Sequence, residues 1–109
     1  MATAYKVLGT SNPAATTATT LYTVPATTST IVSTINICNQ SSSPAAFRIA
    51  IRPAGATLAA NHYIAYDTAI PGNDSIALTM GITLATTDVI TVYASSTTMS
   101  FLAFGSELT

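Results

Sequence analysis

The residues that could perform acid–base or nucleophilic chemistry are few, and they lie in one part of the sequence. His62 is the single histidine, and Asp67 and Asp74 follow it. A histidine that activates a serine or threonine, oriented by a carboxylate, is the arrangement of nucleophilic hydrolysis. No serine stands in a G-x-S-x-G motif, and His62 lies in a tyrosine-rich segment. We therefore expect His62 to be a surface or packing residue and the chain not to be an enzyme.

The two aspartates also flank a turn, where paired carboxylates could act as general acid and base. Asp and Asn are more often found in turns because they hydrogen-bond nearby backbone amides. Calcium takes six to eight oxygen ligands, and Asp67, Asn73 and Asp74 supply few. Zinc sites use clusters of Cys and His, of which this chain has only Cys38 and His62. No metal, cofactor or catalytic residue is therefore predicted.

Tyrosine side chains offer a second kind of chemistry, because an aromatic face and a hydroxyl can together bind a sugar ring. Tyrosines in strands more often fill sheet faces, so glycan binding is the alternative rather than the leading prediction. The loops at residues 39–44 and 54–61 would frame such a site. The tyrosines are Tyr5, Tyr22, Tyr63, Tyr66 and Tyr93.

The scarcity of charge is the most informative property of the composition. Only 6% of residues are charged and the formal net charge is -1, whereas about 25% are charged in an ordinary domain. With only Lys6, Arg48 and Arg52 as basic residues, no phosphate-binding patch is possible and nucleic-acid binding is not expected. A neutral surface rich in Thr and Ser favours burial against other subunits. The rival interpretation is a secreted or salt-adapted protein whose surface simply favours these residues.

Targeting signals are not evident in the sequence. The first residues lack the basic leader and apolar stretch of a secretory signal. No apolar run approaches the roughly 20 residues of a membrane-spanning helix. We expect a protein that is made in the cytoplasm and has no membrane partner.

The elements that must position these side chains are short strands. Thr, Val, Ile and Tyr recur in stretches broken by Pro, Gly, Asn and Ser about every 8–12 residues, which is typical of a sandwich or barrel. The pattern predicts a single all-β domain over residues 1–109, an antiparallel β-sandwich of the jelly-roll kind with about eight strands. The expected strands cover residues 3–8, 19–24, 29–38, 47–52, 62–66, 76–84, 89–94 and 99–104.

Alternation within these strands predicts which side chains face the core. Ile31, Ile35 and Ile37 share one face of their strand and should be buried together, with Val32 on the other face. Arg48 and Arg52 alternate with apolar residues and should face solvent or a partner. Residues 70–73 suit a type II turn with Gly72 at positive φ. Gly81 suggests a bulge or a close backbone approach.

Four segments carry a resemblance to a known class of proteins. Residues 4–9 (AYKVLG), 21–25 (LYTVP), 47–53 (FRIAIRP) and 104–108 (FGSEL) resemble small virion structural proteins of tailed bacteriophages, including phages of cyanobacteria. The resemblance implies a non-enzymatic virion protein, such as a capsid decoration (cement) protein or a subunit attached to the neck or tail. It also implies a location in the virion and other virion proteins as partners.

These lines together predict a structural subunit that acts by subunit–subunit packing, as a homo-oligomer for which a trimer is one possibility. The alternative is an adhesin or receptor-binding module of a phage tail that binds a surface glycan. Residues 2–8 could also add a strand to a neighbour's sheet, although a first strand of the chain's own sandwich is the preferred interpretation. The expected partner-binding residues are Tyr5, Lys6, Arg48, Arg52, Tyr63 and Tyr66.

Overall fold

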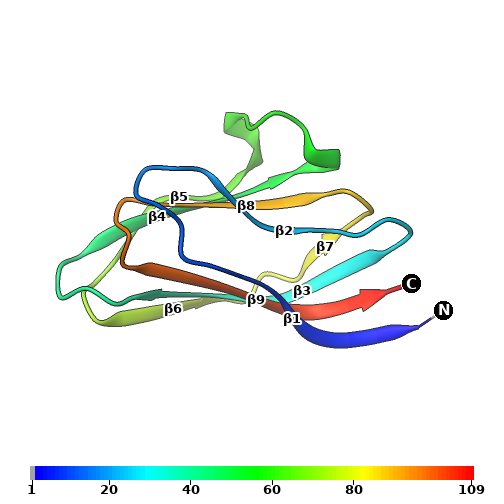
Figure 1. Cartoon of the computed structure of the whole chain (residues 1–109), viewed down its shortest axis with the longest axis horizontal. Coiled ribbons are helices and arrows are strands. Elements are labelled where there is room, and N and C mark those ends of the chain that lie inside the picture. The colour runs from blue at the N-terminus through cyan, green and yellow to red at the C-terminus, as the bar shows by residue number, and fades with distance from the viewer. Residues whose placement is uncertain (1) are drawn as a thin grey trace.

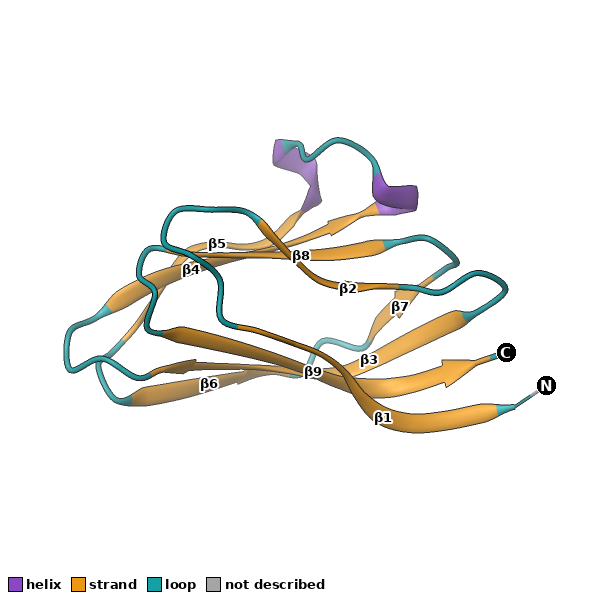
Figure 2. Cartoon of the chain, in the orientation of Figure 1, coloured by secondary structure: helices purple, strands orange, loops and turns teal. Residues whose placement is uncertain are grey.

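The computed structural model describes residues 2–109, which form two antiparallel sheets packed face to face (Figures 1 and 2). The predicted all-β sandwich is confirmed. One sheet has the order β1-β9-β3-β6 with β7 also paired to β3, and we call it the β9 sheet; the β8 sheet has the order β2-β8-β4-β5. The strands are β1 (Thr3–Ser11), β2 (Thr19–Thr23), β3 (Ser29–Asn39), β4 (Ala45–Arg52), β5 (Tyr63–Ile70), β6 (Asp74–Leu78), β7 (Ile82–Leu84), β8 (Val89–Ala94) and β9 (Met99–Leu108).

The strand order is that of a jelly roll. β1 pairs with β9, β2 with β8, β3 with β6 and β7, and β4 with β5, as in one long antiparallel ribbon. The ribbon is rolled so that β9 also pairs with β3 and β8 with β4. Rolling closes the core between the two sheets but leaves β1, β2, β5 and the β6–β7 strand as sheet edges. The ends of the ribbon meet, because Ala2 and Thr109 exchange two backbone hydrogen bonds of 3.0 and 2.9 Å.

The inward faces of both sheets supply one apolar core. Phe47 of β4 and Phe101 of β9 are fully buried and meet edge to face, with ring centroids 6.2 Å apart. This pair joins the two sheets at the centre of the sandwich. The other large side chains that are fully buried are aliphatic or, for Met99, a thioether: Val24, Val32, Ile35, Ile37, Ile49, Ile70, Leu84, Ile90, Val92 and Met99.

The predicted isoleucine face of β3 is wrong at its first position. The register of β3 against β9 shifts between Val32 and Thr34, which marks a bulge at Ser33. A bulge adds one residue to one strand and so reverses the alternation on either side of it. Ile35 and Ile37 are buried as expected, but Ile31 is 45% exposed and Val32 takes its place in the core at 1%.

The long strand expected at residues 76–84 is two strands. Residues 79–81 leave the ladder opposite the β3 bulge, so β6 and β7 pair with β3 on either side of it. Gly81 has a φ of 65° and nothing near its Cα that an added Cβ would touch, so it turns the chain without a close approach.

The predicted type II turn is also corrected. The positive φ falls on Asn73 rather than Gly72. Gly72 is needed for a different reason, because a Cβ there would lie 2.2 Å from the carbonyl oxygen of Ser42.

Two short 3₁₀ turns follow β4 and project beyond the β8 sheet (Figure 2): η1 (Pro53–Gly55) and η2 (Ala60–His62). In η2 the ring Nδ1 of His62 accepts a 3.2 Å hydrogen bond from the backbone N–H of Ala59. The histidine therefore has a local capping role in this turn.

Candidate interaction surfaces

The structure divides the six predicted partner-binding residues among three places. Tyr5 lies on the outer face of the β9 sheet, and Lys6 points the other way, toward the gap between the sheets. The remaining four lie on or beside the outer face of the β8 sheet: Arg48, Arg52, Tyr63 and Tyr66. The sequence therefore pointed to two opposite surfaces rather than to one site.

Arg48 is held by its own chain. Its Nε and Nη2 donate hydrogen bonds of 2.7 and 3.3 Å to the two carboxylate oxygens of Asp67. Its guanidinium carbon lies 4.2 Å from the ring centroids of both Tyr66 and Tyr93. The Asp67 carboxylate raises the pKa of Arg48 further above its usual range. The acid that Arg48 binds is thus intramolecular, and the role of Arg48 in partner binding stays a prediction.

A bulge in β5 makes this cluster possible. Asp67 has a φ of 49°, and the register of β5 against β4 shifts between Phe47 and Ile49. An Asp tolerates the left-handed region better than most residues, and a bulge redirects the side chains around it. Tyr66 and Asp67, consecutive in sequence, can therefore both reach Arg48.

Arg52 has a different environment from Arg48. Its Nε donates to the hydroxyl of Thr91 at 3.0 Å and its Nη1 to the carbonyl oxygen of Ala56 at 3.2 Å. No acidic side chain of residues 2–109 forms an ion pair with it. Arg52 is therefore the basic residue whose charge stays uncompensated within the described chain.

A shallow, mainly apolar depression borders the tyrosines of β5. Its lining residues are Leu58, Ala59, Ala60, Tyr63 and Tyr66. The rings of Tyr63 and Tyr66 meet edge to face with centroids 4.9 Å apart. The depression is the place where the glycan alternative would have to operate.

The other loop predicted to frame a glycan site is occupied by its own contacts. Asn39 is fully buried. Its amide nitrogen donates to the carbonyl oxygen of Ser43 at 2.9 Å, and its amide oxygen accepts from the N–H of Ser41 at 3.1 Å and the hydroxyl of Thr98 at 3.2 Å. Asn39 therefore stabilises the loop rather than presenting an amide to a ligand.

The outer face of the β9 sheet is apolar. Tyr5 is 85% exposed, Val7 50% and Ile31 45%, and Phe104 is partly exposed beside them. In the ladder Tyr5 and Ile31 both stand beside Ser106, and Val7 stands beside Phe104. A shallow groove runs between Tyr5, Ile31 and Phe104. We call these four residues, Tyr5, Val7, Ile31 and Phe104, the outer apolar patch.

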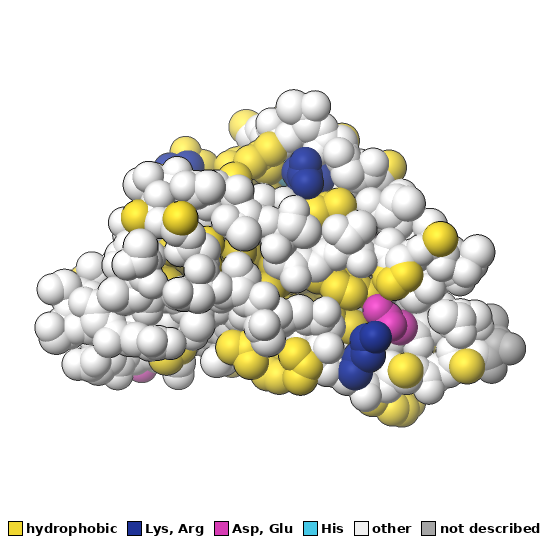
Figure 3. Space-filling model, viewed as in Figure 1, with side chains coloured by type: hydrophobic (Ala, Val, Ile, Leu, Met, Phe, Trp, Pro, Cys, Tyr) yellow, Lys and Arg dark blue, Asp and Glu magenta, His cyan; other side chains and the backbone are white. Residues whose placement is uncertain are grey.

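Charged side chains are absent from this face among residues 2–109. Lys6 and Glu107 are the charged residues of β1 and β9; Lys6 borders the groove, but its ammonium group bonds Glu107 on the inward side of the sheet. Strand alternation places Asp74 of β6 on that side as well, at the end of the strand. In the view of Figure 3 most of the molecular surface is likewise hydrophobic or uncharged.

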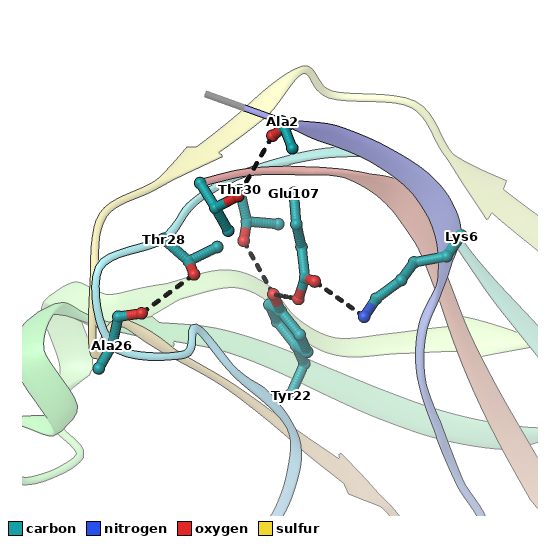
Figure 4. Close-up of polar contacts among 8 residues, drawn as sticks. Ala2, Lys6, Tyr22, Ala26, Thr28, Thr30 and Glu107 are labelled. Atoms are coloured by element: carbon teal, nitrogen blue, oxygen red, sulfur yellow. Dashed lines mark hydrogen bonds and ion pairs between the residues drawn. The ribbon is translucent and has the colours of Figure 1, made fainter.

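A polar cluster lies between the sheets near the chain ends (Figure 4). Glu107, only 9% exposed, forms a 2.8 Å ion pair with Lys6 and accepts a 2.5 Å hydrogen bond from the hydroxyl of Tyr22. The Tyr22 oxygen lies 2.8 Å from the hydroxyl of Thr30. Because the Tyr22 proton is directed to Glu107, Thr30 must be the donor in that second bond.

The cluster shifts two pKa values in opposite directions. Lys6, and next Tyr22, hold the pKa of Glu107 below its usual value. Burial, and then the hydrogen bond to Glu107, raises the pKa of Tyr22 to about 12. Lys6 thus forms an internal ion pair, and its role in partner binding stays a prediction.

These shifts predict a pH dependence of stability. Glu107 contributes stability that is present above the unfolded-state pKa of about 4.3 and is lost as pH falls through the lower folded-state pKa. Tyr22 contributes stability that is present below about pH 10 and is lost as pH rises toward 12. We expect Glu107→Gln to cost about 1–2 kcal/mol at pH 7, and this cost should shrink below pH 4.

Urea unfolding at several pH values measures this cost. Asp74→Asn is the matched control, because the exposed Asp74 carboxylate bonds the adjacent Ser75 amide. A Glu107→Gln cost that stays constant from pH 7 to pH 3 would contradict the assigned ion pair.

Several residues of these surfaces were not predicted from the sequence. Glu107 was missed because the last strand was expected to end at residue 104. Its alternation with Phe101, Ala103 and Gly105 is the signal that would have placed it on the inward face. Ile31 was missed because the bulge at Ser33 turns its side chain to the outer face. The sequence gives no signal for this bulge.

The described residues do not assemble a site for acid–base catalysis or metal binding. Neither Asp67 nor Asp74 bonds His62; the two aspartates bond Arg48 and the Ser75 amide. No three His, Cys, Asp or Glu side chains of residues 2–109 gather as metal ligands. None of the helices in this part of the chain is long and apolar enough to cross a membrane.

Comparisons with known proteins do not extend these observations. No protein-family model, curated protein or solved structure matches the chain.

Proposed function

We propose that this chain is a non-enzymatic structural subunit of a bacteriophage particle that acts by packing against other protein subunits. The observation that carries the proposal is the outer apolar patch on a sheet face without charged side chains in residues 2–109. Interface cores are depleted in charge and enriched in aromatic residues, and Tyr5 and Phe104 lie on this face. The jelly-roll architecture is one that viral capsid proteins use, although lectins use it as well.

The ion pairs of the chain support packing rather than charge recognition. Lys6 and Arg48 both bond acids of their own chain. Association through the outer apolar patch should therefore depend weakly on salt, because screening weakens interactions between exposed charges. The chain's position in the particle, whether capsid decoration, neck or tail, is left open in this proposal.

The test is to look for the chain in purified particles made from the genome that encodes it. Mass spectrometry should find it in many copies per particle, and it should stay bound through a wash at about 1 M salt. An Ile31→Asp variant should be lost from the particles, whereas Met80→Asp, at an equally exposed residue, should be retained. Absence of the wild-type chain from intact particles would reject the proposal.

An adhesin is the second candidate, favoured by the depression that Tyr63 and Tyr66 line. If the purified chain bound host-surface glycans and lost that binding in Tyr63→Ala, this function would replace the first.

A further inference from the structure

β1 is an edge strand, so one side of its backbone has no neighbouring strand. The alternation of hydrogen bonds to β9 shows which residues direct their N–H and C=O groups to that open side. Ala2 and Thr109 exchange both of their hydrogen bonds. Hydrogen-bonded and non-hydrogen-bonded pairs alternate along an antiparallel ladder. Ala4 and Lys6 therefore bond β9, whereas Thr3, Tyr5 and Val7 direct their N–H and C=O groups away from it, all three residues being exposed.

The β1 edge is regular over residues 3–7, where its outward backbone groups have no backbone partner within residues 2–109. Natural sheets guard edges with bulges, short strands and charged side chains, including charges that point inward. β5 has the Asp67 bulge, the β6–β7 strand is interrupted at residues 79–81, and β2 has only five residues. β1 has a bulge between Val7 and Gly9 and carries the inward-pointing Lys6, but the Lys6 charge is paired with Glu107 and the ladder is regular over residues 3–7. Residues 3–7 thus form an open strand edge next to the outer apolar patch.

We propose that two copies of the chain associate by antiparallel pairing of their β1 edges, with Tyr5 on the twofold axis. This register places Tyr5 opposite Tyr5, and Thr3 opposite Val7 in both directions. All six outward N–H groups of the two copies then find a carbonyl partner. An axis at Ala4 or Lys6 would pair two of the three residues in each copy, and so four N–H groups. The inference rests on the proposed function, for which it names a second copy as the partner.

The side chains agree with this pairing. The two Tyr5 rings would lie next to each other on the outer face and join the outer apolar patches of both copies into one surface. On the inner face the two Lys6 side chains would become diagonal neighbours across the axis. The ion pair of each Lys6 with its own Glu107 compensates the charge that would otherwise repel the second copy.

The test uses charge at the axis. In a hydrogen-bonded pair the Cα atoms are about 5.5 Å apart, so like charges at residue 5 would oppose each other directly. Tyr5→Lys and Tyr5→Glu should each raise the dimer dissociation constant about tenfold or more, whereas an equimolar mixture of the two should form a heterodimer. Met80→Lys, at another exposed hydrophobic residue, should dimerise like the wild type.

Sedimentation velocity of tag-free protein from about 10 to 500 µM would follow the association, and native mass spectrometry would identify the heterodimer. Circular dichroism would check that each variant folds; Tyr5 makes little contact with its own chain, being 85% exposed. A wild type that stays monomeric, or Tyr5→Lys and Tyr5→Glu variants that dimerise unchanged, would overturn the pairing.

The proposed function fails independently of this pairing. A monomeric wild type that is nevertheless found in particles rejects the β1 pairing alone. A dimer that behaves as described but is absent from particles supports the pairing and rejects the virion function.

Discussion

Replacing Phe101 with alanine is expected to lower the free energy of unfolding by about 3–5 kcal/mol, the usual cost of removing a fully buried aromatic ring. Phe101 is fully buried, and its ring meets that of Phe47 from the opposite sheet. Removal leaves a cavity at the centre of the core and removes the aromatic contact that joins the sheets. Chemical denaturation followed by circular dichroism would measure the loss.

Leu102→Ala is the matched control for Phe101→Ala. Leu102 is the next residue of β9 and lies on its outer face, where it is only partly buried. We expect the control to lose about 1 kcal/mol or less. Equal losses for the two variants would mean that the inward and outward faces of β9 are assigned incorrectly.

Replacing Gly105 with alanine is expected to cost about 3 kcal/mol or more, as overpacking against backbone that cannot move freely does. A Cβ on Gly105 would lie 2.0 Å from the carbonyl oxygen of Ile31, just before the Ser33 bulge. The neighbouring strands β3 and β9 would have to separate locally. Thermal and urea unfolding of the variant would show the loss.

Gly81→Ala separates this steric effect from backbone conformation. Gly81 has a φ of 65°, but an added Cβ would have nothing within 4 Å. The cost should therefore be about 1 kcal/mol, from the left-handed conformation alone. A Gly105→Ala variant no less stable than Gly81→Ala would show that β3 and β9 are not so closely apposed.

The strands and their buried faces could be predicted from the sequence where apolar and polar side chains alternate without interruption. In β4 the apolar residues Phe47 and Ile49 face the core, and Arg48 between them faces outward, as predicted. The eight expected strands correspond to the strands of the jelly roll, with β6 and β7 together making one of them. Local pattern was sufficient there because each of these strands buries one face.

The prediction of which side chains face the core and which face outward failed where the hydrogen-bond ladder is irregular. The bulges at Ser33 and Asp67 depend on how one strand meets the next, and hydrophobic alternation within a single strand does not reveal them. The bulge at Ser33 places Val32 rather than Ile31 in the core, and the bulge at Asp67 brings the Asp67 carboxylate to Arg48. The candidate surfaces therefore needed the three-dimensional register, since both depend on a bulge.

The pairing of Ala2 with Thr109 has a practical consequence for handling the protein. Any sequence fused to either end emerges at one pole of the sandwich, where Figure 1 shows N and C side by side. That pole adjoins Thr3, the first residue of the open strand edge. A purification tag left on the chain would crowd this edge and could mask self-association, whereas a label inserted at residues 79–81, outside the ladder, would avoid that edge.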